Sequence, residues 1–168
     1  MNSVSDAELE RISIFVDVQN VYYTCRQAFQ SNFDYNQFFR RVTSDRILVN
    51  ACAYATDVGD EKQRQFQNIL RGIGFAVNLK PMLKRVDGTT KADWDIGIAL
   101  DVYEAAPKCD TVVLVSGDGD FTVLLQRIRD RFDTRSEIYG VTDLTSNSLI
   151  QAADKFIAID QQLLLTKN

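Results

Sequence analysis

The sequence contains no histidine among its 168 residues. This absence excludes the Ser-His-Asp and Cys-His groupings of nucleophilic catalysis, and it excludes the usual histidine-ligated zinc site. Any chemistry must therefore use carboxylates, amides, hydroxyls, lysine or arginine. Because carboxylate and amide oxygens are hard ligands, Mg²⁺ or Mn²⁺ is the expected cofactor.

Cysteines and long apolar runs are also scarce. The three cysteines are widely spaced and form no CxxC pair, which favours reduced cytosolic thiols over a disulfide framework or a zinc site. Residues 1–11 lack the apolar core of a signal peptide, and no apolar run approaches the length of a membrane span. These features predict a cytoplasmic protein without a membrane partner.

The length and the hydrophobic content of 45% fit one globular domain over residues 1–168, with its core at about residues 11–160. The net charge of −4 argues against general adhesion to nucleic acid. It is compatible with a local basic groove, because recognition depends on where the charge lies. The oligomeric state stays open and includes a homodimer.

Apolar segments that alternate with helix-like segments predict a three-layer α/β/α sandwich around a mainly parallel sheet of about five strands, with a Rossmann-like topology. The expected strands are Ile12–Asp17, Ile47–Tyr54, Phe75–Leu79, Val112–Val115 and Glu137–Tyr139. Residues 156–159 form an apolar end piece. If the strand order reverses between the first and fourth strands, their carboxyl ends lie side by side.

The segment from Thr111 to Leu125 is the expected active site. Its apolar run predicts a buried strand, which breaks at Ser116-Gly-Asp-Gly-Asp120 before an amphipathic helix begins. Asp118 and Asp120 therefore lie where a strand passes into a helix. In open α/β sheets, ligands bind at that end of the strands.

Asp17 and Asn20 follow the first strand in the same way. Asp17 could equally be an N-cap, and Asn20 could be a turn residue or the cap itself, since both residue types are common there. Strand-order reversal would bring Asp17 close to Asp118. The sequence alone leaves the structural and functional alternatives open.

The segment Asp93-Trp-Asp95 to Asp101 predicts a helix with an acidic first turn. Acids in a first turn are expected from the helix dipole alone, so Asp93 needs no functional explanation. Asp95 and Asp101 are six residues apart, or about 120° around the helix, so only one of them can point directly at an ion. Asp95 is the better placed of the two.

A cluster of aspartates this close would repel itself unless protons or a divalent cation neutralise it. Mg²⁺ takes one or two carboxylates directly and keeps water ligands for a phosphate substrate. Whether one or two ions bind stays open. Four basic residues between the third strand and the next helix form either a solvated loop or a phosphate-contacting rim. They are Lys80, Lys84, Arg85 and Lys91.

Three segments resemble the motifs of NYN domains: Phe15–Asn20, Lys91–Asp101 and Ser116–Phe121. The closing segment Ser148–Phe156 is similar to the LabA-like bacterial branch, which is part of the PIN-like nuclease superfamily. The resemblance extends from residue 12 to residue 159. Its most specific part is the Ser-Gly-Asp-Gly-Asp-Phe turn between strand and helix.

This resemblance implies a PIN-like ribonuclease fold that hydrolyses RNA, expected to be single-stranded, with Mg²⁺ or Mn²⁺. The residues that it places around the metal are Asp17, Asn20, Asp95, Asp118 and Asp120. Asp17, Asp95 and Asp118 would be ligands, and Asp120 would complete the ligand set or cap the following helix. Asn20 would orient a ligand, a water or a phosphate.

Two further residues would support the ligands without touching the metal, namely Asp101, which matches a recurrent acid of the family, and Ser116. A haloacid-dehalogenase-like phosphatase is the first alternative, but its Asp-x-Asp nucleophile motif is missing, because the chain reads Asp17-Val-Gln19. The second alternative is a catalytically silent PIN-like module that binds RNA or a protein. Metal-dependent cleavage of RNA separates the nuclease from the silent module.

Overall fold

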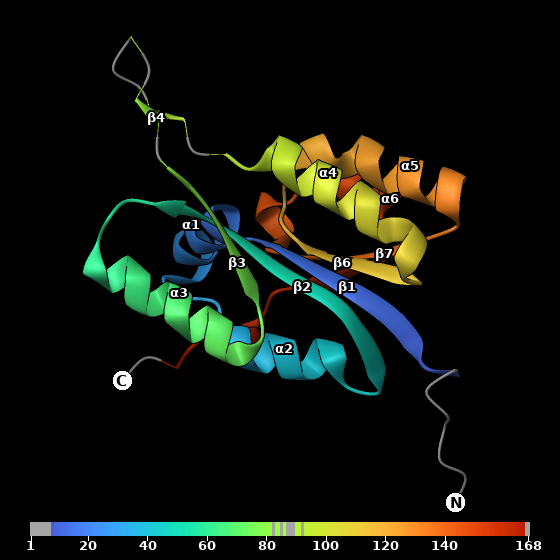
Figure 1. Cartoon of the computed structure of the whole chain (residues 1–168), viewed down its shortest axis with the longest axis horizontal. Coiled ribbons are helices and arrows are strands. Elements are labelled where there is room, and N and C mark those ends of the chain that lie inside the picture. The colour runs from blue at the N-terminus through green and yellow to red at the C-terminus, as the bar shows by residue number, and fades with distance from the viewer. Residues whose placement is uncertain (1–7, 82, 85, 87–89, 92, 167–168) are drawn as a thin grey trace, which may run out of the picture.

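A computed structural model describes residues 8–81, 83–84, 86, 90–91 and 93–166 (Figure 1). Its centre is a six-stranded parallel sheet with the strand order β3-β2-β1-β6-β7-β8. These strands are β1 (Glu10–Asp17), β2 (Arg46–Asp57), β3 (Ala76–Pro81), β6 (Thr111–Val115), β7 (Arg135–Gly140) and β8 (Lys155–Ala158). The predicted fold class is thereby confirmed.

Six α-helices connect the strands and cover both faces of the sheet (Figure 1). They are α1 (Val18–Phe29), α2 (Tyr35–Thr43), α3 (Glu61–Ile73), α4 (Asp95–Ala105), α5 (Thr122–Phe132) and α6 (Asn147–Ala152). Short 3₁₀ turns lie at Ala106–Lys108, Gly119–Phe121, Thr142–Leu144 and Gln161–Leu163. In the described part of the chain, no helix is long and apolar enough to cross a membrane.

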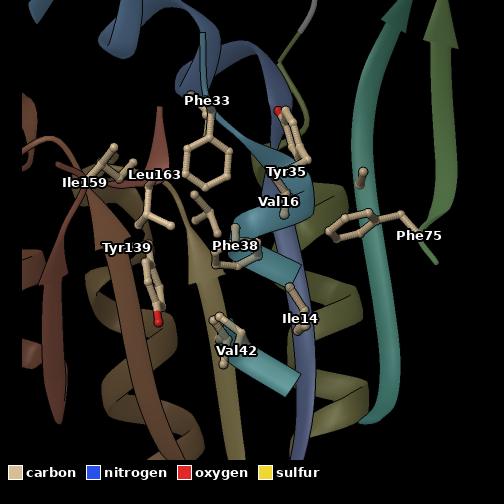
Figure 2. Packing of buried hydrophobic residues seen from close by; sticks show 14 of the residues in the cluster. Ile14, Val16, Phe33, Tyr35, Phe38, Val42, Phe75, Tyr139, Ile159 and Leu163 are labelled. Atoms are coloured by element: carbon tan, nitrogen blue, oxygen red, sulfur yellow. The ribbon is translucent and has the colours of Figure 1, made fainter. Parts of the chain in front are cut away.

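Two hydrophobic clusters lie on opposite faces of the sheet because side chains alternate along each strand. On β6, Val113 and Val115 pack into the cluster beneath α1, α2 and α3, whereas Val112 and Leu114 pack beneath α4, α5 and α6. Figure 2 shows the first cluster, in which aromatic rings such as Phe38 fill the space between sheet and helices. Both faces are covered, so the strands read as continuous apolar runs in the sequence.

The strand order reverses between β1 and β6, which meets the condition under which Asp17 and Asp118 were expected to lie close together. β1 pairs with β2 on one side and with β6 on the other, and all three strands run in the same direction. The chain leaves β1 for one face of the sheet and leaves β6 for the other. The carboxyl ends of β1 and β6 therefore form a topological switch point, where α/β proteins bind ligands.

Two details differ from the expectation. The end piece at residues 156–159 lies largely within a sixth strand, β8, which pairs with β7 at the edge of the sheet. Asp93 lies outside α4, which begins at Asp95 after Trp94. The Trp94 indole donates a hydrogen bond to the Ala55 carbonyl at 2.9 Å, and this contact fixes where the helix begins.

The basic segment before α4 contains a small antiparallel pair, β4 (Leu83–Lys84) and β5 (Thr90–Lys91). Lys84 and Lys91 lie in these two strands, but their side chains are outside the described part of the structure. Arg85 is wholly outside the described residues. Of the four basic residues, Lys80 is the one whose side chain lies in the described part of the structure.

Candidate metal centre

The ends of β1 and β6 are joined through Ser116. The Ser116 hydroxyl donates to Asp17 Oδ2 at 3.4 Å, and Ser116 Oγ in turn accepts a hydrogen bond from the Asp118 N–H at 3.2 Å. Asp17 and Ser116 are buried, with 8% and 1% of their surfaces exposed. Ser116 therefore fixes the position of the turn that carries Asp118 relative to the carboxylate of Asp17.

Asn20 makes a second connection between the two strand ends. Its side-chain oxygen accepts a hydrogen bond from the Gly117 N–H at 3.0 Å, and its own N–H donates to Asp17 Oδ1 at 3.3 Å. Asp17 is thus the N-cap of α1 while its carboxylate also faces the switch point. The capping and functional alternatives for Asp17 do not exclude each other.

Three carboxylates from two segments converge at this end of the sheet. One oxygen from each of Asp95, Asp118 and Asp120 lies within 4.8 Å of the other two. Asp95 is the first residue of α4, whereas Asp118 and Asp120 follow β6, and Asp118 Oδ1 accepts a hydrogen bond from the Asp120 N–H at 2.9 Å. Ligand oxygens about 2.1 Å from Mg²⁺ lie about 3–4 Å apart, so a small closing movement would let all three bind one ion. The donor set fits a hard divalent cation.

The glycines beside Asp118 allow this turn to pack closely against the loop that precedes α6. A Cβ atom on Gly117 would lie 2.8 Å from the Leu144 carbonyl oxygen, and one on Gly119 would lie 2.7 Å from Ser146 Oγ. The Ser146 N–H also donates to the Gly117 carbonyl at 3.0 Å. The Gly-Asp-Gly-Asp pattern is therefore a steric requirement for holding Asp118 in place.

Two of the carboxyl groups hold protons more tightly than ordinary aspartates. Burial raises the pKa of Asp17 to about 6, with the nearby charge of Asp118 adding to the shift and the hydrogen bond from Asn20 opposing it. Burial, a hydrogen bond with Asp118 and the charge of that group raise the pKa of Asp95 to about 7. A divalent cation would replace these protons as the neutralising charge.

Without a divalent ion, the free energy of unfolding is expected to fall as the pH rises from about 4 to about 7. A carboxyl group whose pKa is raised by folding contributes its full stabilisation at pH values below 3.8, the pKa in the unfolded chain. This stabilisation is lost as the pH rises through the pKa of the folded state. For Asp17 the loss is about 3 kcal/mol. Urea unfolding in EDTA at several pH values measures it, and Asp17→Asn should flatten the slope. An equal pH dependence of the free energy of unfolding in both proteins would contradict the raised pKa of Asp17.

Asp101 lies outside the three-carboxylate cluster, which agrees with the prediction from helix geometry. Its Oδ2 accepts a hydrogen bond from the Tyr54 hydroxyl at 2.7 Å. The Tyr54 ring packs against Trp94 with a centroid distance of 5.3 Å, and Trp94 directly precedes Asp95. Asp101 and Tyr54 thereby support the start of α4. The sequence interpretation missed this role of Tyr54 and Trp94, although the position of Trp94 between two acids was a signal.

Lys80 lies next to the start of α4. Its ammonium group donates to the Asp93 carbonyl at 2.9 Å and lies 5.5 Å from the centre of the Trp94 ring. A positive charge beside an acidic cluster suits a substrate whose phosphate groups must approach carboxylates. The same contacts also stabilise the segment that carries Asp95.

Comparison with known proteins agrees with the sequence motifs and the geometry. A model of the NYN domain matches residues 11–160. The low amplitude and bright protein LabA of Synechococcus elongatus is 27% identical over 159 residues, which cover 89% of this chain and 84% of that protein. The crystal structure of a Vibrio parahaemolyticus protein of unknown function has 55% sequence identity and a TM-score of 0.91, and the match covers 98% of this chain and 100% of that one. The fold of this close structural neighbour fits a PIN-like domain.

Proposed function

The chain belongs to the NYN domain family as a LabA-like member, and from this premise we propose that it is a Mg²⁺- or Mn²⁺-dependent endoribonuclease. The observation that supports this function most is the convergence of Asp95, Asp118 and Asp120 within 4.8 Å. They meet beside the carboxyl ends of β1 and β6, where an α/β sheet binds its ligands.

Each polar residue of the centre has a proposed role. Asp95, Asp118 and Asp120 would hold the ion, and Asp17 adds a fourth carboxylate to the proposed ligand set. A bound divalent ion stabilises charge on phosphoryl oxygens and lowers the pKa of a water that attacks phosphorus. Asn20 keeps its hydrogen bond to Gly117 and so holds the turn that carries Asp118.

The proposed substrate is single-stranded RNA. Lys80 places a positive charge beside the start of α4, where it would attract the phosphate backbone toward the acidic centre. Lys84, Arg85 and Lys91 stay predictions as further phosphate contacts. Cytoplasmic location, homodimer formation and a single domain over the whole chain also stay predictions from the sequence.

The purified chain is expected to cut a labelled single-stranded RNA internally when Mn²⁺ or Mg²⁺ is present and to stop cutting when EDTA removes the metal. A DNA strand of the same sequence, tested in parallel, measures the preference for RNA. Cleavage that continues in EDTA would contradict the metal-dependent mechanism. RNA binding without cleavage in either metal would instead support the silent RNA-binding module.

A further inference from the structure

A hollow of about 390 Å³ lies beside the proposed metal centre, at the same end of the sheet. Its walls come from the first turns of α1, the end of β2 and the first half of α3. Phe33 and Tyr35 lie among its lining residues, and Figure 2 shows their rings at the upper end of the core cluster, close to α1. The volume is within the range of small-ligand sites.

Residues that line the hollow are directly connected to residues of the metal centre. Val18 and Gln19 line the hollow and directly follow Asp17 in the first turn of α1. On the other side, Ala55 lines the hollow, and its carbonyl accepts the hydrogen bond from the indole of Trp94, which precedes Asp95. A polymeric substrate that placed one phosphate group at the metal centre would therefore carry its adjacent units past the mouth of the hollow.

The lining combines aromatic faces with carboxamide groups. Tyr22 and Tyr23 are 51% and 60% exposed, and their rings lie 5.4 Å apart at an interplanar angle of 76°. The side chains of Gln19, Asn32 and Gln63 also line the hollow. Aromatic faces stack on nucleobases, and carboxamides can both donate to and accept from their edges.

A cation lies one strand away from the hollow, beside the segment that carries Asp95. Thr56 lines the hollow and is the sheet partner of Lys80 on the neighbouring strand β3. The Lys80 ammonium contacts the Asp93 carbonyl and the Trp94 ring on the face of the sheet that α4 covers, whereas the hollow lies on the face that α1 and α3 cover. An aromatic hollow, a cation and an acidic metal centre at one end of the sheet suit a base joined to a phosphate backbone.

We infer that this hollow binds one unstacked base of a single-stranded RNA whose backbone crosses the metal centre, an inference that rests on the proposed function. Stacking on Tyr22 supplies the affinity, and it tolerates any base because every base has an aromatic face. The carboxamides of Gln19 and Gln63 favour particular base edges. The substrate is consequently RNA with at least one base free of pairing near the cleaved bond.

The test compares binding of a fluorescent single-stranded RNA with binding of an otherwise identical strand that lacks one base, position by position along the strand. Fluorescence anisotropy is measured in an Asp118→Asn background, so that cleavage does not interfere. Tyr22→Ala is expected to weaken binding of the intact RNA by between about 5-fold and about 150-fold and to remove the penalty for the missing base. Tyr22→Phe, which keeps the ring, should bind within about 2-fold of the Asp118→Asn background.

Leu100→Ala is the matched control, because Leu100 is an exposed apolar side chain on α4 (65%, against 51% for Tyr22) and lies outside the hollow. Equal affinity before and after Tyr22→Ala, or no penalty for a missing base at any position, overturns the inference. Cleavage is a separate readout. RNA binding through the hollow without cleavage would contradict the proposed nuclease function but not the base-binding hollow. Cleavage without any effect of the missing base would contradict the base-binding hollow but not the nuclease function.

Discussion

Replacing Asp118 with asparagine is expected to lower the rate of RNA cleavage at least about 100-fold. The carboxamide removes a negative charge from the centre of the proposed ligand set, and neutral oxygen is a weaker ligand for a hard divalent ion. The side-chain oxygen can still accept the hydrogen bond from the Asp120 N–H, so the turn should keep its shape. Single-turnover cleavage of a labelled RNA in saturating Mn²⁺ measures the loss.

Asp130→Asn is the matched control for this variant, since Asp130 lies exposed on α5 and the substitution changes the charge equally. The metal-free Asp118→Asn protein should unfold at a temperature no lower than that of the wild type, because the substitution relieves repulsion among the carboxylates. Lower stability would indicate that Asp118 acts mainly as a structural cap. Cleavage at the wild-type rate by a folded Asp118→Asn protein would remove Asp118 from the mechanism.

Mn²⁺ is expected to raise the melting temperature of the wild type by about 5–10 °C when the free ion is 100 times its dissociation constant. An ion that binds only the folded state stabilises it in proportion to the logarithm of its concentration, which corresponds to about 2.7 kcal/mol at this ratio. In Asp95→Asn the rise should be much smaller, because one of the three converging carboxylates is gone. Thermal unfolding followed by circular dichroism across a Mn²⁺ titration measures both proteins.

KCl at matched ionic strength controls for general screening of the acidic chain. The Asp130→Asn variant should respond to Mn²⁺ as the wild type does. If Asp95→Asn gains as much stability as the wild type, the ion binds elsewhere on the protein. The effect also depends on pH. Mn²⁺ must displace the protons of Asp95 and Asp17, so its effect should weaken as the pH falls from about 7 through about 6.

The sequence predicted the fold well because its strongest signals are local. Val112–Val115 is apolar throughout, as a strand buried on both faces must be, and the structure confirms it within β6. Right-handed crossovers allowed the pairing of β1 with β6 only if the strand order reversed between them, and the structure shows that it does. The edge strand β8 was missed because four residues with partly exposed side chains give only a weak apolar signal.

In the candidate site, too, residues marked by local sequence patterns were predicted, whereas contacts between residues far apart in the sequence were not. Asp118 and Asp120 could be located from the break between a buried strand and a helix, and Asp95 could be preferred over Asp101 from helical geometry. Ser116 was expected to support the ligands, but its bond to Asp17, which joins residues 99 apart, was not anticipated. The bond between Tyr54 and Asp101 spans 47 residues. Such pairings depend on how distant elements pack, which local patterns of residue type and spacing do not reveal.

Asp93 shows how tertiary contacts override a local rule. An acid at this position suits the first turn of a helix, and the sequence therefore predicted that the helix includes it. In the structure, Trp94 is tied to Ala55, and the helix begins only at Asp95. Asp93 instead accepts a hydrogen bond from the Asp95 N–H at 3.4 Å through its side chain, and its carbonyl accepts from Lys80.

The location of the metal tests the central claim most directly. Crystals grown with Mn²⁺ and measured at the manganese absorption edge would show each bound ion as a peak in the anomalous difference map. A strong peak is expected within coordination distance of the carboxylates of Asp95, Asp118 and Asp120. Clear Mn²⁺ peaks at other positions, with none among these three aspartates, would contradict it.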